Sequence, residues 1–282
     1  MSKFHLLHCV PSPRMHGPNG YREIIESVQW GLEQLGHEVT YSLNAYHPTS
    51  TNIVFGAQML PLEVLKQLRE DTIVYNFEQG RGLDRTEMRP EVSFIAENFS
   101  IWDYSTANVD MWKSLGNEST KLVPVGYAPV LSRIPKAQDQ DIEIFFYGTP
   151  GQKRLNAFHQ LSHEGYRVLF ASGLYGSARD SLIARSKIVL NINIMDRSRI
   201  FEVVRVSYLL ANRKAVVAVL DPDTAVESDL TRCIRSTNSA DLVDACEQLL
   251  SNDTQRAQLE NVGFEIFAQR DITKILDKAL SC

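Results

Sequence analysis

The chain has 282 residues, of which 44% are hydrophobic and 22% are charged, and its formal net charge at pH 7 is −5. This composition is typical of a globular protein with a large core, and the length suits two domains. The acidic balance argues against a surface that grips nucleic acid or an anionic membrane over a broad area, although it leaves room for a local basic groove.

The cysteines and the N-terminal sequence both indicate a protein of a reducing compartment. Four cysteines, Cys9, Cys233, Cys246 and Cys282, are scattered without CxxC or metal-ligand spacing. We therefore expect free thiols rather than disulfides. The apolar part of the opening sequence MSKFHLLHCV is too short for a signal peptide or a membrane helix. We predict a cytoplasmic protein without stable membrane insertion.

Apolar runs alternate with amphipathic stretches in the first half of the chain. This alternation predicts an α/β fold, in which helices cover both faces of a parallel sheet. Strands are expected at residues 4–10, 37–43, 52–56, 72–77, 101–105 and 120–125. Helices are expected at residues 21–36, 60–68 and 107–115.

A polar segment with two prolines, residues 129–141, is the best linker candidate, and the alternation restarts after it. Strands are expected at 142–147, 166–171, 188–190, 215–220 and 233–236. Helices are expected at 153–164, 177–185, from 200 onward, at 240–250 and at 254–280, the last broken near Gly263 or Arg270. We predict two Rossmann-like domains, 1–130 and 131–282, facing each other across a cleft, with the last helix as a candidate to pack back on the first domain.

The stretch 186–220 is typical of a strand, loop, helix and strand, a unit that places polar groups where open parallel sheets bind ligands. Asn191 and Asn193 follow the first strand. Glu202 falls in the predicted first turn of the helix, with Arg205 three residues later on the same face. The helix dipole favours an ionised Glu202 that accepts hydrogen bonds from sugar or ribose hydroxyls. The alternative is a surface ion pair of Glu202 with Arg205, which would contribute little.

Two loops that follow predicted strands in the second half could contact a nucleotide. In the loop GTPGQKR, Gly148 permits close approach, the helix N-terminus offers free N–H groups, and Lys153 and Arg154 add charge for a phosphate. The alternative is a tight turn with a solvated basic pair. In the loop GLYG, Gly173 and Tyr175 could hold a base, or the loop could simply enter a helix. GxxxxGK[ST] and GxGxxG are both missing from the sequence.

Polar residues also follow predicted strands of the N-terminal half. Glu78 and Asp103 are the carboxylates expected to serve as a base, and either could instead be a structural cap. A glycine-containing loop after the first strand could approach a phosphate, with a histidine beside it that is either a base or inert. The residues predicted on this side, which we assign to the acceptor, are His16, Gly17, Gly20 and Tyr104.

The chain resembles bacterial family-1-type glycosyltransferases, the group that includes spore-maturation glycosyltransferases. The resemblance is carried by an ordered set of segments: YNFEQ (75–79), DYS (103–105), VGY (125–127), FFYGTPGQKR (145–154), GLYG (173–176), RSKIVLNIN (185–193) and IFEVVRVSYLLANRKAVV (200–217). It covers most of the chain from about residue 70 and is strongest in the C-terminal half. The resemblance implies the GT-B architecture in a short version: two Rossmann-like domains, a nucleotide-sugar donor held mainly by the C-terminal one, and an acceptor in the cleft.

The resemblance also implies roles for individual residues. The resemblance implies that Glu202 holds donor hydroxyls, and Glu78 and Asp103 join it as catalytic candidates because of their place after strands. The donor-binding residues that the resemblance implies are Gly148, Lys153, Arg154, Asn191, Asn193 and Arg205, and the loop GLYG adds Gly173 and Tyr175. No cofactor or metal is implied, because basic side chains and helix N-termini neutralise the leaving diphosphate in this family. The sequence Asp221-Pro-Asp223 has the DxD form of a metal motif, but it follows a strand and contains proline, so we interpret it as a turn.

The sequence departs from the family pattern around the helix that follows Glu202. Many retaining members carry a second glutamate eight positions later, where this chain has Leu210. Tyr208 takes that place if Lys214 is matched to the family's lysine. Asn193 stands where relatives often have histidine. These departures leave retention or inversion of the sugar's configuration open.

Other functions stay open at this level. The acceptor is expected to be a glycan rather than modified DNA, although phage enzymes of similar architecture act on DNA. Arginines in the N-terminal half could supply a local DNA-binding surface: Arg14, Arg22, Arg81, Arg85 and Arg89. A protein that binds nucleotide sugars without catalysis is a further alternative. A nicotinamide-dependent oxidoreductase is disfavoured by the missing GxGxxG sequence.

Overall fold

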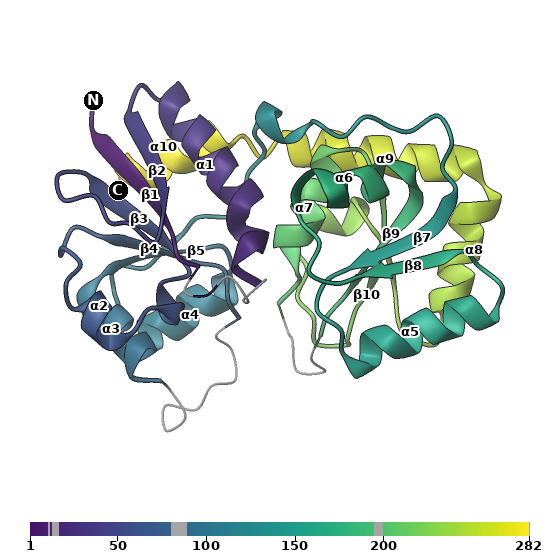
Figure 1. Cartoon of the computed structure of the whole chain (residues 1–282), viewed down its shortest axis with the longest axis horizontal. Helices are drawn as coiled ribbons and strands as arrows, with labels where there is room; N and C mark the ends of the chain where they lie inside the picture. Colours follow the sequence, from purple (N-terminus) through teal and green to yellow (C-terminus); the bar gives the residue numbers. More distant parts are fainter. Residues whose placement is uncertain (11, 13–16, 80–88, 195–199, 282) are drawn as a thin grey trace. The chain divides into compact units, whose positions relative to one another are not determined.

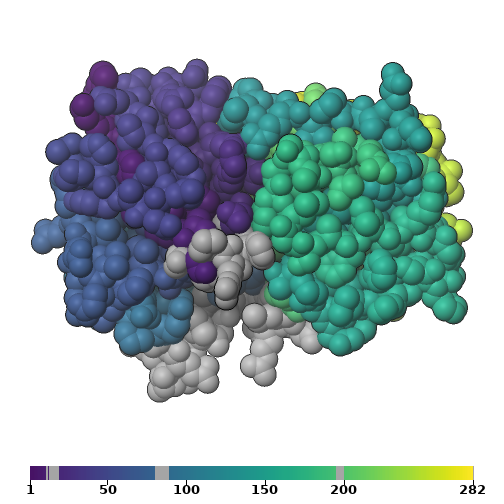
Figure 2. All heavy atoms as spheres, viewed as in Figure 1, coloured from purple at the N-terminus to yellow at the C-terminus, as the bar shows by residue number. Residues whose placement is uncertain are grey.

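The computed structural model describes residues 1–10, 12, 17–79, 89–194 and 200–281. The chain divides into two compact α/β units (Figure 1). Unit 1 contains residues 1–128 together with 271–282, and unit 2 contains residues 129–270. The predicted domain boundary lay at residue 130. In the space-filling view of Figure 2, the residues of unit 2 drawn in teal and green form a continuous surface.

Unit 1 is built on a parallel sheet with the strand order β2-β1-β3-β4-β5-β6. Its strands are β1 (Lys3–His8), β2 (Glu38–Leu43), β3 (Thr51–Phe55), β4 (Ile73–Asn76), β5 (Ser100–Asp103) and β6 (Lys121–Leu122). β1 and β3 are buried along almost their whole length, because helices cover both faces of the sheet. The edge strand β2 is largely exposed.

The helices of unit 1 include one that returns from the far end of the chain. They are α1 (Arg22–Gln34), α2 (Leu62–Leu65), α3 (Pro90–Asn98), α4 (Thr106–Ser114) and α10 (Ile272–Ser281). Figure 1 shows α10 in yellow beside α1. The two helices approach closely at Gly31, where an added Cβ would lie 2.7 Å from Leu276 Cδ1. Any side chain at Gly31 would therefore require the side chain of Leu276 to move.

Unit 2 has a second parallel sheet with the strand order β11-β10-β9-β7-β8. Its strands are β7 (Ile142–Tyr147), β8 (Val168–Ala171), β9 (Ser186–Ile192), β10 (Ala215–Val219) and β11 (Arg235–Thr237). Its helices are α5 (Gln152–His163), α6 (Gly176–Arg185), α7 (Val203–Ala211), α8 (Leu242–Ser251) and α9 (Asp253–Ala268). α5 and α8 share a core cluster with one face of the sheet, and α6, α7 and α9 cover the other (Figure 1).

The predicted α/β class with two parallel sheets is confirmed. Three elements differ from prediction: α3 was missed, the helix expected at 60–68 is the single turn α2, and the helix expected at 254–280 is two helices, α9 and α10. The break lies at residues 269–271, at the predicted Arg270 and not at Gly263. Cys9, Cys233 and Cys246 are buried free thiols. Within the described residues, every helix falls short of the length and hydropathy needed to cross a membrane.

Candidate active site

The carboxyl edge of the unit 2 sheet brings together most of the residues predicted to bind the donor. β7 and β9 are neighbours in the sheet, so Gly148 after β7 lies beside Asn191 at the end of β9. α5 is the helix that follows the first strand and α7 is the helix that follows the second. Arg154 and Arg205 therefore extend from two different helices toward one edge.

Arg154 is buried and fixed by the backbone around it. Its Nε donates to Ile192 O at 2.8 Å and its Nη1 donates to Thr149 O at 2.8 Å. The guanidinium also lies over the ring of Phe146, 5.1 Å from the centroid. Burial, followed by the nearby charge of Arg205, lowers the pKa of Arg154 to about 10. The alternative of a solvated basic pair is therefore wrong for Arg154.

Glu202 connects the two arginines. Arg205 Nη2 donates to Glu202 Oε1 at 2.8 Å and its Nη1 donates to Oε2 at 2.9 Å, while Arg154 Nη2 lies 3.4 Å from the same Oε2. Arg205 Nη1 also donates to Asn191 Oδ1 at 3.0 Å. The side chain of Arg205 is 9% exposed and that of Glu202 is 30% exposed. The pair is thus more than a surface ion pair, and two cations share one carboxylate.

We predicted Glu202 within the first turn of the helix, but the structure places it just before that turn. It is the N-cap residue, with φ −78° and ψ 62°, and α7 begins at Val203. Its side chain caps no backbone N–H group of the helix. The carboxylate turns instead to the guanidinium groups, because two charged donors are stronger partners than backbone amides.

Gly148 permits the close approach of both guanidinium groups to the backbone. Its φ of +146° lies in a region that side chains rarely adopt. An added Cβ would stand 3.0 Å from Arg205 Nη2 and 3.4 Å from Arg154 Nη1. A larger residue at this position would displace the arginines.

Lys153 points to a different partner. Its Nζ forms an ion pair with Asp221 Oδ1, in the turn that follows β10. Thr224 N donates to Asp221 O at 2.9 Å, and Asp221 N donates back to Thr224 Oγ1 at 3.2 Å, so the Asp-Pro-Asp sequence forms a turn as predicted. Within the part of the chain that the structure describes, His, Cys, Asp and Glu residues form no group of three or more that could hold a metal. Metal-independent chemistry stays a prediction.

The loop GLYG lies at the carboxyl end of β8, the edge strand next to β7. Gly173 has φ +68° and Tyr175 is the N-cap residue of α6. Asn193 follows β9 and is buried. The structure thus places these predicted donor residues on the same edge of the sheet as Arg154.

A stack of aromatic and arginine side chains behind Arg205 was missed in the sequence. The guanidinium of Arg205 lies 5.5 Å from the ring centroid of Tyr147, and that of Arg179 lies 5.6 Å from it. Arg179 also lies 4.6 Å from the centroid of Tyr208, whose hydroxyl donates to Asp180 Oδ2 at 2.9 Å. Cation–π stacking follows no fixed sequence spacing, so the sequence pattern could not predict this stack. Tyr208 is the one member that we noted in the sequence, as a departure from the family pattern.

In unit 1, Glu78 is the predicted base that remains accessible. It is exposed, just beyond the carboxyl end of β4, and its Oε1 accepts a short hydrogen bond from the hydroxyl of Tyr21. Burial raises the pKa of Tyr21, so this tyrosine stays a hydrogen-bond donor. Asn108 Nδ2 donates to Glu78 O at 2.8 Å and fixes the backbone there.

Asp103 has the structural role that we considered as its alternative. It is 0% exposed, so it cannot serve as an accessible base. It accepts hydrogen bonds from Asn76 Nδ2 at 2.7 Å, Trp112 Nε1 at 2.9 Å and Ser105 N at 3.0 Å. Burial raises the pKa of Asp103 to about 6, against the opposing effect of these donors. Asp103 connects β4, β5 and α4.

The remaining predicted acceptor-side residues lie near the same end of unit 1 or outside the described residues. Gly17 and Gly20 belong to a short 3-10 helix, Gly17–Tyr21, and an added Cβ at Gly20 would meet no atom within 4 Å. Tyr104 is buried and stacks on Phe77. His16 lies outside the described residues. His8, at the end of β1, is buried, and its Nδ1 lies 3.2 Å from Tyr41 OH. We did not predict it as a site residue, because its place in the sequence is that of an ordinary strand residue.

Comparison with known proteins gives one sequence relative and many structural ones. No family model matches the chain. Uncharacterized protein R358 of Acanthamoeba polyphaga mimivirus is 25% identical over 186 residues, which are 65% of this chain and 63% of that protein.

Solved structures resemble the chain along its whole length. HepE of Anabaena in complex with UDP-glucose has a TM-score of 0.62 and 13% identity, covering 100% of this chain and 99% of that one. AviGT4, a glycosyltransferase involved in avilamycin A biosynthesis, has a TM-score of 0.59 and 14% identity, covering 100% and 96%. A DNA-modifying β-glucosyltransferase has a TM-score of 0.61 and 13% identity, covering 100% of both chains. The chain therefore has the GT-B fold of glycosyltransferases, with two parallel α/β units.

Proposed function

We propose that the protein is a glycosyltransferase that moves a sugar from a nucleotide-diphosphate donor to a hydroxyl group of an acceptor. One observation carries the proposal: the buried guanidinium group of Arg154 and the largely buried one of Arg205 share a single carboxylate at the carboxyl edge of the unit 2 sheet. The structural likeness to HepE, which was solved with UDP and with UDP-glucose, supports a uridine nucleotide as donor.

The excess positive charge suits a leaving diphosphate. Two guanidinium groups and one carboxylate leave one net positive charge on side chains that are 3%, 9% and 30% exposed. Guanidinium groups bind phosphate oxygens in a bidentate manner, and fixed charges stabilise a developing negative charge strongly. The N-terminus of α5 adds free N–H groups, because its N-cap residue Gly151 provides no side-chain cap. These groups would supply the charge that a divalent cation supplies in metal-dependent transferases, so no cofactor is proposed.

Glu202 would hold the donor sugar. Its two carboxylate oxygens have lone pairs beyond those that accept from the arginines, and 30% of the side chain is exposed. Those lone pairs can accept hydrogen bonds from sugar hydroxyls. We assign Glu202 to binding and orientation, and not to proton transfer.

Glu78 is the carboxylate that we propose as the base for the acceptor hydroxyl. It is exposed just beyond the carboxyl end of β4 and is oriented by the hydroxyl of Tyr21. A carboxylate with one oxygen held in place and its surface open to solvent can accept a proton from an approaching hydroxyl. Asp103, which is fully buried, is withdrawn from this role.

Isothermal titration with UDP, GDP and TDP tests the proposal, with the bare nucleosides as controls. We expect one diphosphate to bind at least tenfold more tightly than its nucleoside, since each charge-assisted contact contributes about 1.5–3 kcal/mol. Release of the free diphosphate from its sugar conjugate then tests catalysis. Binding to none of the three would contradict the proposal, and binding without release or transfer would indicate a non-catalytic nucleotide-sugar-binding protein.

Modified DNA is a second candidate acceptor, favoured by the likeness to the DNA-modifying β-glucosyltransferase. Two of the arginines considered for DNA are described, and both have local partners: Arg22 pairs with Glu26, and Arg89 Nη2 donates to Gln58 O. Arg14, Arg81 and Arg85 lie outside the described residues. We therefore propose a glycan acceptor first. A gel-shift assay with plain and modified duplex separates the two, because only a DNA acceptor predicts a shift.

We also propose a cytoplasmic protein that resembles the bacterial family-1-type enzymes. The location is supported by the three buried free thiols, Cys9, Cys233 and Cys246. Thiol titration of the denatured protein, purified without reductant, would test it.

A further inference from the structure

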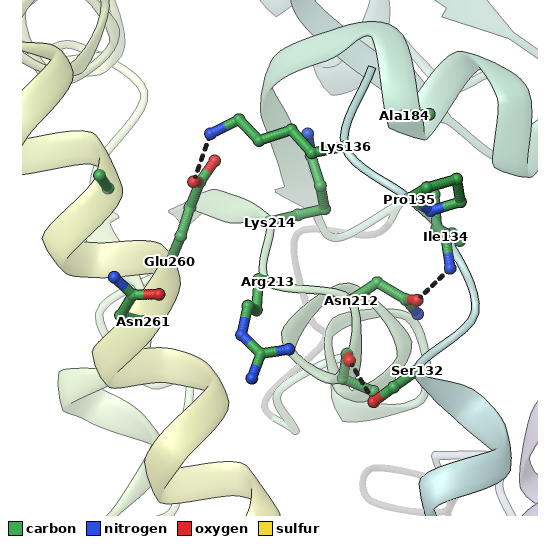
Figure 3. A pocket seen from close by; sticks show the side chains of 12 residues that line it. Ser132, Ile134, Pro135, Lys136, Ala184, Asn212, Arg213, Lys214, Glu260 and Asn261 are labelled. Atoms are coloured by element: carbon green, nitrogen blue, oxygen red, sulfur yellow. Dashed lines mark hydrogen bonds and ion pairs between the residues drawn. The ribbon is translucent and has the colours of Figure 1, made fainter. Parts of the chain in front are cut away.

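A pocket of about 370 Å³ lies in unit 2 away from the candidate donor site (Figure 3). Its walls come from residues 132–136, from Ala184 at the end of α6, from residues 211–214 and from α9. Residues 211–214 lead into β10, and Ala184 stands just before β9. The pocket is thus at the amino edge of the sheet, whereas Arg154 and Arg205 are at the carboxyl edge.

The pocket contains a buried carboxylate with an unused oxygen. Glu260 on α9 is 5% exposed, and its Oε2 lies 2.9 Å from Lys136 Nζ. Its Oε1 is buried and accepts no hydrogen bond from any of the described residues. A buried acceptor without a donor is costly, so this oxygen requires a hydrogen-bond donor from outside the described chain.

Cations outnumber this carboxylate. Lys214 is 3% exposed and its Nζ donates to Ser186 O at 2.5 Å. Burial lowers the pKa of Lys214 to about 8, so most of the molecules still carry the charge at pH 7. With Lys136 and Arg213, three cations and one carboxylate line the pocket, a net charge of +2. Such a lining favours an anionic ligand.

Arg213 is held with its hydrogen-bond donors unused. Its backbone has φ +50°, which is uncommon for a residue other than glycine. Its guanidinium lies 3.5 Å from the ring centroid of Phe264 and makes no hydrogen bond or ion pair with the described residues. Figure 3 shows the side chain beside α9, on the same side of the pocket as Glu260. Stacking leaves the edge of the guanidinium available, and that edge is the part that binds oxyanions.

The opposite wall is rigid. Asn212 Oδ1 accepts from Arg133 N at 2.9 Å and from Ile134 N at 2.7 Å. Its Nδ2 donates to Leu131 O at 2.9 Å and to Tyr208 O at 2.8 Å. All four hydrogen-bonding positions of this amide are in use, so it shapes the pocket and leaves ligand binding to the charged residues.

We propose that this pocket binds a small hydroxylated anion of the sugar-phosphate class, with its phosphate on Arg213, Lys136 and Lys214 and a hydroxyl group donating to Glu260 Oε1. The volume falls within the range of small-molecule sites, about 300–1,000 Å³. An anion without a hydroxyl group, such as sulfate, would leave the Glu260 oxygen without a donor. A neutral sugar alone would leave the cations without a counter-charge.

Titration of the full chain with glucose 6-phosphate, inorganic phosphate and glucose tests the proposal. We expect glucose 6-phosphate to bind more tightly than either of the others. Arg213→Gln should weaken both phosphate-bearing probes about tenfold, the loss of one charge-assisted contact. Lys136→Gln is a second variant, which removes a positive charge while the new amide can still donate to Glu260 Oε2. Arg232→Gln, which removes an exposed arginine elsewhere in unit 2, is the matched control and should change nothing.

Glu260→Gln distinguishes the two halves of the proposed ligand. Removing the negative charge should leave inorganic phosphate binding equal or tighter, while glucose 6-phosphate loses its advantage over phosphate. Arg205→Gln reports on the donor site and should leave glucose 6-phosphate binding intact. The proposal is wrong if no probe binds in the millimolar range, if Glu260→Gln leaves the preference unchanged, or if Arg205→Gln removes binding that Arg213→Gln spares.

Discussion

The carboxyl edges of the two sheets each present an acidic side chain, in opposite surroundings. In unit 1, Asp103 is fully buried and receives only neutral donors, from Asn76, Trp112 and the backbone of Ser105. In unit 2, Glu202 is partly exposed and lies between two guanidinium groups. Acidic side chains at the carboxyl edge of a parallel sheet thus take two different roles.

The difference shows how the partners of a carboxylate decide what it can do. Neutral donors satisfy the oxygens of Asp103 without supplying a counter-charge, so the group connects strands and helix, and burial raises its pKa against the opposing effect of these donors. Two cations around one carboxylate leave one net positive charge, which suits the anionic donor that we propose. A fully satisfied acid stabilises the fold, whereas a site with surplus charge is prepared for a ligand.

The largest expected effect is on stability, from Asp103→Ala. The variant leaves the donors of Asn76, Trp112 and Ser105 buried without an acceptor, at about 1–3 kcal/mol each. We expect the free energy of unfolding, measured by denaturant titration, to fall by about 3–5 kcal/mol. Asp110→Ala, an exposed position on α4, is the control and should cost less than about 0.5 kcal/mol. If the two variants lost equal amounts of unfolding free energy, Asp103 would not be the residue that connects the strands and the helix.

The second expectation concerns pH. The pKa of Asp103 is raised from 3.8 to about 6, so the folded state binds its proton more tightly than the unfolded state. The contribution to stability is therefore complete below about pH 4 and is lost as pH rises through about 6, by up to about 3 kcal/mol. Asp103→Asn should remove this fall from the pH profile of the unfolding free energy. A variant with the wild-type slope between pH 4 and 6 would assign the proton to another group.

Next in size is the effect of Arg205→Gln on the donor. The variant loses a charge-assisted contact worth about 1.5–3 kcal/mol, and Glu202 then cancels the one guanidinium charge that remains, that of Arg154. We expect UDP binding, measured by calorimetry, to weaken at least tenfold, and uridine binding to change much less. Arg167→Gln removes an exposed arginine of unit 2 as the control. A parallel loss for UDP and uridine would show that Arg205 supports the pocket's shape and not the phosphates.

Glu202→Gln separates binding of the sugar from binding of the diphosphate. The substitution keeps the shape but weakens acceptance of hydroxyl hydrogen bonds, so UDP-glucose should lose about tenfold in affinity, the equivalent of one good hydrogen bond. UDP itself should bind equally or more tightly, because a negative charge is removed. Glu202→Ala should lose more transfer activity, with a melting temperature near that of the wild type. Full turnover in a folded Glu202→Ala protein would reject the assignment.

The smallest expected effect belongs to Asp223. Asp221 is the residue of this turn that pairs with Lys153, and the turn is closed by Thr224. Asp223→Asn should therefore change UDP-glucose binding by less than about twofold, within about 0.5 kcal/mol. Treatment with EDTA should likewise leave binding and turnover intact. If turnover required Mn²⁺ or Mg²⁺ and Asp223→Asn abolished this metal-dependent turnover, the arginines would not act alone.

The elements of the fold could be predicted where hydrophobic periodicity is strong. Continuous apolar runs such as 215–219 correspond to buried parallel strands, and α1 follows its apolar face closely. α3 was missed because its sequence, PEVSFIAEN, mixes polar and apolar residues without a clear face and buries only Ile95 and Ala96. Tertiary packing against the sheet, which no local pattern records, stabilises that helix.

The site could be located from the sequence, but not its geometry. Glycine loops and polar residues after strands identified Gly148, Asn191, Glu202 and Arg205 correctly as neighbours on one edge. The sequence could not show that Arg154 is buried while Lys153 turns to Asp221, because adjacent helical residues point in different directions. The burial of Asp103 was equally hidden, since it depends on Trp112 one helix later.

The return of α10 to unit 1 has a consequence for how the protein is made. Synthesis proceeds through residues 1–128 and then through all of unit 2 before the segment 271–281 emerges from the ribosome. Until then α1 lacks the helix that packs on it at Gly31, and its apolar surface stays in water. Unit 2 can complete its core before α10 is synthesised. Unit 1, whose synthesis begins first, is therefore the unit whose folding is completed last. A chain stopped at residue 270 would expose that α1 surface permanently and would be prone to self-association.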